Sequence, residues 1–66
     1  MTGRIKSFSR AHGYGFIEFD GKDIFFHILD YKGQGTPSVG TTVWFETYES
    51  RKGLRAKNIR EIKHGE

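Results

Sequence analysis

The sequence contains no cysteine and no long apolar run. Without cysteine, disulfides cannot stabilise the fold and thiolate metal sites are excluded. A reducing, cytoplasmic compartment agrees with this composition. The apolar segments are too short for a signal peptide or a membrane span. We therefore expect a cytoplasmic protein that has no membrane partner.

The sequence also lacks the sustained 3.6-residue apolar period of an amphipathic helix. Nine glycines and one proline instead divide the 66 residues into short segments. Such segments, rich in β-branched and aromatic residues and bounded by turn residues, are typical of strands. Strands are predicted over residues 4–9, 14–19, 23–28, 42–48 and 54–62. A loop is predicted at about 29–40 and a polar turn at 49–53.

Five strands in so short a chain would expose unpaired sheet edges unless the sheet closes. Short turns link the first three strands, and Asp20-Gly21 is the strongest hairpin signal among them. The predicted fold is therefore all-β, a five-stranded antiparallel oligonucleotide-binding (OB) barrel. An SH3-like barrel has a similar number of strands, and periodicity does not separate the two. Residues 1–66 are expected to form a single domain, with residues 63–66 as a frayed tail.

Alternation along the predicted strands assigns side chains to the two faces of the barrel wall. Ile24 marks the inner face of its strand, which places Phe26 inside and Phe25 and His27 outside. In the preceding strand Ile17 belongs inside. The remaining rings of that strand then point outward, at residues 14 and 16. We expect the outer face to carry a cluster of aromatic side chains.

The aromatic content of 15% is high for a chain with a formal charge of +3. Positive charge attracts phosphate, and exposed rings stack on unpaired bases. Arg4, Lys6, Arg10 and His12 lie close in sequence to the aromatic cluster. This combination favours a partner that is single-stranded nucleic acid.

Residues 12–19, HGYGFIEF, nearly match the ribonucleoprotein pattern K/R-G-F/Y-G/A-F-V-x-F/Y. Residues 23–27, DIFFH, follow at the distance of a hairpin partner. Together these segments resemble the two RNA-binding motifs of the bacterial cold-shock proteins. Residues 3–8, 40–46 and 53–59 resemble that family's opening, fourth and closing segments, so nearly the whole chain is covered.

This resemblance implies an OB barrel that binds single-stranded RNA and single-stranded DNA. It further implies an RNA chaperone, or a cold-shock-type regulator of transcription or translation. The implied contacts come from Lys6, Phe8, His12, Tyr14, Phe16, Phe25 and His27, with support from Arg4 and Arg10. His12 occupies the place of a phosphate-facing lysine. No cofactor, metal or catalytic residue is expected, and the chain is expected to be a monomer, with weak dimerisation left open.

The sequence departs from the family pattern at several stacking positions. Ser7 stands where a tryptophan is usual, and Ile28 stands where a phenylalanine is usual. The central loop is shortened, and Thr36 lies near the place of a further phenylalanine. Each stacked base contributes about 1–3 kcal/mol, so these losses are expected to weaken binding. Trp44 and Tyr31 are candidates to replace the missing stacking rings. Alternation places Trp44 outside the barrel, but the sequence does not show whether either residue lies on the binding face.

Two other functions are compatible with a small barrel of this kind. An SH3-like module would use its aromatic residues to bind a proline-rich peptide, with nucleic-acid binding weakened or lost. Such grooves usually carry acidic residues, whereas basic residues accompany this cluster. An enzyme would need a base or nucleophile with an orienting partner. Asp23 and His27 are four strand residues apart, about 13 Å, so catalysis is not expected.

Overall fold

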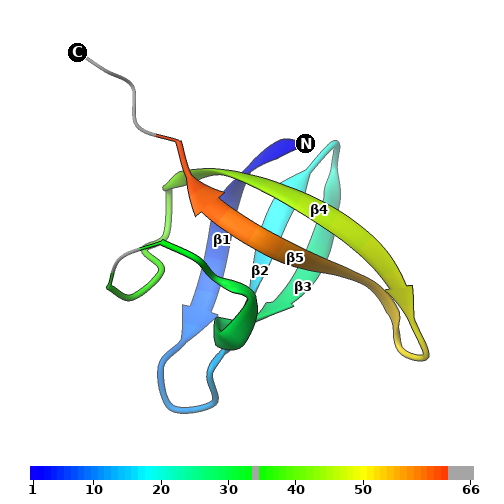
Figure 1. The fold of residues 1–66 in the computed structure, drawn as a ribbon, viewed down its shortest axis with the longest axis horizontal. Helices are drawn as coiled ribbons and strands as arrows, with labels where there is room; N and C mark the ends of the chain where they lie inside the picture. The colour runs from blue at the N-terminus through cyan, green and yellow to red at the C-terminus, as the bar shows by residue number, and fades with distance from the viewer. Residues whose placement is uncertain (34, 63–66) are drawn as a thin grey trace.

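The computed structural model describes residues 1–33 and 35–62. Its strands are β1 (Thr2–Ser9), β2 (Tyr14–Phe19), β3 (Lys22–His27), β4 (Thr42–Ser50) and β5 (Gly53–Glu61). They form a closed barrel in the order β1-β2-β3-β5-β4 (Figure 1). The predicted five-stranded OB barrel is confirmed. The expected frayed tail, residues 63–66, lies outside the described residues.

The pairing of the strands explains how the barrel closes. β1 pairs antiparallel with β2 and with β4, and the β2–β3 and β4–β5 pairs are hairpins. The β3–β5 pair is parallel, with Phe25 opposite Arg55. The sequence did not predict this parallel contact. It follows from closure, because the long loop reverses the chain between β3 and β4 and the β4–β5 turn reverses it a second time, so β5 runs in the same direction as β3.

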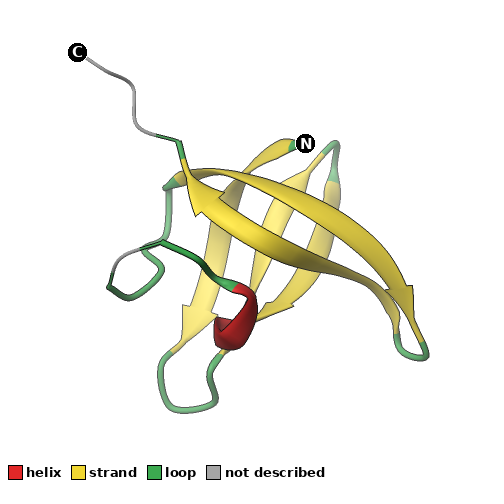
Figure 2. Ribbon diagram, viewed as in Figure 1, coloured by secondary structure: helices red, strands yellow, loops and turns green. Residues whose placement is uncertain are grey.

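The observed strand bounds differ from the predicted ones mainly at their ends. β1 begins two residues earlier because Thr2 and Gly3 pair with β4. β3 ends at His27, since Ile28 begins the 3-10 turn η1 (Ile28–Asp30). This turn is the one helical segment among the residues described (Figure 2). β2 has the predicted bounds.

The β2–β3 turn has the geometry that its sequence predicts. Asp20 and Gly21 both have positive φ, 53° and 76°. Two-residue hairpins of type I′ require positive φ at both central residues, for which Asp-Gly is a favoured pair. This local turn fixes the β2–β3 register, and that register places the outward side chains of the two strands side by side.

The core fills the barrel interior. Ile5, Ile17, Ile24, Phe26, Tyr31, Val43, Phe45, Ala56 and Ile59 are buried and form one cluster. The inward assignment of Ile17, Ile24 and Phe26 is confirmed, since each is at most 2% exposed. Inward and outward side chains therefore alternate along β2 and β3 as predicted.

Candidate nucleic-acid interface

Three rings gather on the outer side of β2 and β3, and we call Tyr14, Phe16 and Phe25 the aromatic face. The register sets Phe16 opposite Phe25 and Tyr14 opposite His27. The Phe16 and Phe25 ring centroids are 5.9 Å apart, edge to face, and Tyr14 lies 5.3 Å from Phe25. Tyr14 is 37% exposed, and the two phenylalanines are half-buried. The face offers ring surface that solvent, or a base, can reach.

Gly15 separates the two β2 rings of the aromatic face and belongs to the inner row. It pairs with Phe8 of β1, and a Cβ there would lie 2.9 Å from the Phe8 Cα. The backbone of β1 therefore approaches β2 closely at Gly15. The absence of a side chain lets β1 and β2 pack tightly beneath the outward rings.

The aromatic face forms one wall of a groove, and the β4–β5 hairpin forms the other. Tyr14, Phe16 and Phe25 line the groove together with Lys52, Leu54 and Arg55, and its volume is about 480 Å³. The Arg55 guanidinium carbon lies 4.3 Å from the Phe25 ring centroid. None of these six described residues carries a carboxylate. The groove thus combines apolar ring surface with two positive charges.

Lys52, Leu54 and Arg55 were not among the predicted site residues. Their place in the groove depends on the β3–β5 contact, which joins segments 30 positions apart (Phe25 with Arg55). No local pattern marks that pairing. The nearest signal was the likeness of residues 53–59 to the closing segment of cold-shock proteins, which gave the strand but not its neighbour.

The two predicted histidines flank the aromatic face. The His12 ring lies 5.8 Å from that of Tyr14, and its Nδ1 shares a hydrogen bond of 2.9 Å with the Ser9 hydroxyl. His27 lies directly opposite Tyr14. Its Nδ1 accepts a hydrogen bond of 3.1 Å from the Leu29 N–H. That bond leaves Nε2 of His27 as the nitrogen that can meet a ligand.

Lys6 lies at the edge of this surface and has a partner within the chain. Its Nζ is 3.1 Å from an Asp23 carboxylate oxygen, with the two side chains 53% and 48% exposed. An exposed ion pair of this kind contributes at most about 1 kcal/mol. A phosphate could therefore compete with Asp23 for Lys6, at the cost of breaking the pair.

Phe8 does not join the aromatic face. The β1 register shifts between Ile5 and Ser7, and this extra residue reverses the alternation, so Ser7 points outward and Phe8 inward. The Phe8 ring is half-buried and stacks on Phe26, 5.9 Å between centroids. Ser7 instead lies directly opposite Phe16.

Phe8 lines a second, smaller cavity of about 170 Å³ at one end of the barrel. The other residues lining it are Arg10, Gly13, Ile28 and Thr36. Two positions where the sequence departs from the family pattern, Ile28 and Thr36, thus meet in one place. Arg10 adds a positive charge there, apart from the aromatic face.

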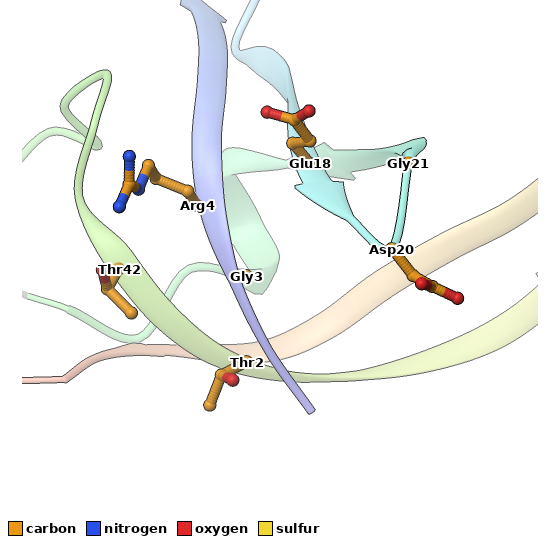
Figure 3. A pocket seen from close by; sticks show the side chains of 7 residues that line it. All are labelled: Thr2, Gly3, Arg4, Glu18, Asp20, Gly21 and Thr42. Carbon is orange, nitrogen blue, oxygen red and sulfur yellow. The ribbon is translucent and has the colours of Figure 1, made fainter.

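Arg4 lies toward the other end of β1, opposite Glu18 and Thr42. These three residues line a pocket of about 370 Å³ together with Thr2, Gly3, Asp20 and Gly21 (Figure 3). The Arg4 side chain extends away from Asp20. Two carboxylates in this pocket offset the charge of Arg4, unlike the charges in the groove beside the aromatic face.

Trp44 and Tyr31 are both away from the aromatic face. Trp44 is 38% exposed, as alternation predicts, and lies on β4 opposite Arg60 and Thr2. It lines a groove of about 620 Å³, which we call the Trp44 groove, with Glu46, Asn58, Arg60 and Glu61.

Tyr31 is buried in the core, so the idea that it replaces a missing stacking ring is wrong. Its hydroxyl donates a hydrogen bond of 2.6 Å to Glu61 Oε2. Burial, together with that bond and the nearby negative charge, raises the pKa of Tyr31 above its ordinary value. Tyr31 thus links the loop after η1 to the end of β5, where it also bridges to Ile59.

Within residues 1–33 and 35–62, no group of three or more His, Asp or Glu side chains is arranged to hold a metal ion. In the same residues, no helix is long and apolar enough to cross a membrane. The site consists of rings, imidazoles and positive charges on a barrel wall.

A closed five-stranded barrel with such a surface defines the OB class of β-proteins. Residues 1–62 match the family model of the "'Cold-shock' DNA-binding domain". The chain belongs to the cold-shock domain family, as the resemblance of its motifs indicated. Members of this family are nucleic-acid-binding proteins and not enzymes.

Individual relatives match the chain over most of its length. It is 44% identical to a cold shock-like protein of Aquifex aeolicus, with 94% of each chain covered. It is 42% identical to the cold shock-like protein CspA of Stigmatella aurantiaca, covering 92% of this chain and 96% of the relative. Among solved structures, Drosophila Unr CSD456 matches with a TM-score of 0.75 at 21% identity, covering 94% of this chain and 26% of that one. That last likeness concerns the fold.

Proposed function

We propose that this protein binds single-stranded RNA and single-stranded DNA by stacking bases on the aromatic face. The observation that carries the proposal is the contact of Tyr14, Phe16 and Phe25 on the outer barrel wall, where the rings remain partly open to solvent. An exposed apolar patch on a small domain marks a binding surface. Rings accept any base because every base has a π-face.

The charges around the rings support a polyanionic strand as the ligand. Lys52 and Arg55 lie in the groove itself, and His12 lies beside Tyr14. Lys6 borders the surface and can exchange Asp23 for a phosphate. Arg10 extends the positive charge to the Phe8 cavity. Arg4 is the weakest candidate because Glu18 lies opposite it.

A preference for single strands over duplexes would let the protein open RNA secondary structure. A domain that captures unpaired bases shifts RNA hairpins toward the open form by mass action. We infer an RNA chaperone of the cytoplasm, acting as a monomer on transcription or translation. A hairpin RNA with a fluorophore and a quencher at its ends should brighten when the protein is added and dim when excess oligothymidine competes.

The binding proposal is tested by fluorescence anisotropy with an end-labelled strand. Labelled nucleic acid is the better reporter because Trp44 lies away from the aromatic face. We expect a hairpin-free hexamer to heptamer to bind far more tightly than the same sequence in a duplex, since paired bases cannot reach the rings. Equal affinity for the single strand and the duplex would contradict the stacking proposal.

The alternative, a protein-interaction barrel, is tested with a proline-rich peptide. The residues beside the rings are Lys52 and Arg55, not the acidic residues such grooves usually carry. We expect retention on heparin resin and no binding of the peptide. The reverse result would favour the protein-interaction function.

A further inference from the structure

Arg55 occupies a position in the groove that a simple stacking surface does not require. It is half-buried on β5, where its backbone lies opposite Phe25 of β3 and Tyr48 of β4. Its guanidinium carbon is 4.3 Å from the Phe25 centroid. A base cannot stack on that side of Phe25 unless Arg55 moves away. At this point of the groove, a ligand therefore meets the Arg55 guanidinium and not the face of the Phe25 ring.

The hydrogen-bond donors of Arg55 are available to a ligand. Within the described part of the chain, its guanidinium forms no side-chain hydrogen bond and no ion pair with a carboxylate. An arginine carries five N–H donors in a rigid planar fork. Contact with Phe25 restricts where this fork lies, and the groove of about 480 Å³ is within the size range of small-ligand sites.

The bases differ in the hydrogen-bond acceptors that they offer to the guanidinium of an arginine. Guanine presents two adjacent acceptors, O6 and N7, and arginine pairs with both at once. Adenine presents N7 beside an amino donor, which opposes the second N–H. Cytosine presents an amino donor on the matching edge. In an unpaired strand this edge is free to turn toward the protein.

We propose that Arg55 makes the groove beside the aromatic face a guanine-selective base site. A guanine enters between the rings of the aromatic face and the β4–β5 hairpin, and its O6 and N7 accept hydrogen bonds from Arg55. Lys52 is placed to neutralise a phosphate of the same strand. This specificity rests on the proposed function, because it needs a single strand on the aromatic face.

The test compares oligothymidine hexamers that differ at one central base, measured by anisotropy at fixed salt. Guanine and adenine stack with similar area, so their ratio isolates the edge contact. We expect guanine to exceed adenine by about five- to tenfold, the lower part of the range for a bidentate pair. In the same position, 7-deazaguanine, which lacks N7, should lose most of that advantage, whereas hypoxanthine, which keeps O6 and N7, should retain it.

Two variants complete the experiment. Arg55→Lys keeps the charge but not the fork, so it should abolish the guanine preference; the readout is the ratio of the guanine and adenine affinities measured with the same variant. Arg60→Lys, on the same strand but in the Trp44 groove, should leave the preference intact. If Arg55→Lys does not fold by circular dichroism, the 7-deazaguanine comparison tests the same contact in the unchanged protein.

The outcomes separate this inference from the proposed function. Tight binding of every hexamer with no guanine preference, or a preference that survives Arg55→Lys, would overturn the guanine site and leave single-strand binding intact. Failure to bind any hexamer would instead contradict the proposed function.

Discussion

Two outward surfaces of the barrel place an aromatic ring beside an arginine. On β2 and β3 the aromatic face meets Arg55 and Lys52, and no carboxylate is among the described residues of that groove. In the Trp44 groove, the exposed Trp44 meets Arg60 together with Glu46 and Glu61. The two surfaces share an exposed ring and a guanidinium, and they differ in net charge.

This difference shows why an exposed ring does not by itself mark a nucleic-acid site. Both glutamates of the Trp44 groove are fixed by internal bonds, Glu46 to Asn58 and Glu61 to Tyr31. Their negative charges would repel the phosphate backbone of a strand whose bases stacked on Trp44. A strand with one charge per nucleotide should therefore select the aromatic face, although Trp44 is the larger ring.

The largest effect is expected for a core truncation next to the aromatic face. Ile24→Ala should reduce the free energy of unfolding by about 2–5 kcal/mol, because it removes buried methylene groups and leaves a cavity. Phe25→Ala, one position along the same strand, should leave the fold largely intact. Urea titration of both variants measures this. Unfolding by Phe25→Ala alone would mean that the outward rings hold the barrel together.

The comparison of the two surfaces is tested most directly by removing one ring from each. Phe25→Ala should weaken single-strand binding by about 1–3 kcal/mol, the usual contribution of a stacked base. Trp44→Ala should leave binding unchanged, since its groove repels the backbone. Anisotropy titrations at one salt concentration give both values. Equal losses would show that the strand crosses both surfaces.

A ring can also be added to each surface through β1. Ser7 lies opposite Phe16, whereas Thr2 lies opposite Trp44. Ser7→Trp should extend the row of Phe16 and Phe25 and tighten binding by about 1 kcal/mol, the low end for one stacked base. Thr2→Trp should have no effect. No gain from Ser7→Trp would exclude β1 from the path of the strand.

The smallest expected effect is on the salt dependence. Binding of a single strand has a slope of about −0.7 in log affinity against log salt for each phosphate neutralised. Lys52→Ala should make the slope shallower by about 0.7, and Arg60→Ala should not change it. Titrations at four or five salt concentrations resolve this difference. A shift with Arg60→Ala instead would place phosphates in the Trp44 groove.

Much of the aromatic face could be predicted from local sequence. The Asp20-Gly21 turn sets the β2–β3 register, and alternation from Ile17 and Ile24 sends Tyr14, Phe16 and Phe25 outward. Each step needs only neighbouring residues and the two-residue period of a strand. The same rule placed Trp44 outside. Alternation by itself does not place Phe8, because one extra residue in β1 reverses the order of inward and outward side chains after Ile5.

The charges that complete the site were not predictable in the same way. Lys6 was expected to face phosphate, and its ion pair with Asp23 joins residues 17 positions apart. Arg55 and Lys52 were missed altogether. Their place in the groove depends on which strands become neighbours. Neither the composition nor the spacing of residues along the chain predicts that pairing.

The sequence by itself determined the strands, the tight turn, the inner and outer faces of β2 and β3, and the family. The strands, the turn and the two faces depend on residues close in the chain, and the family is evident from motifs along it. Only the tertiary structure decided which positive charges border the aromatic face and that Trp44 lies in a groove of its own. Closure of the barrel brings β5 beside β3 and β4 beside β1. This long-range packing places arginine and lysine beside the aromatic face, and it places two glutamates beside Trp44.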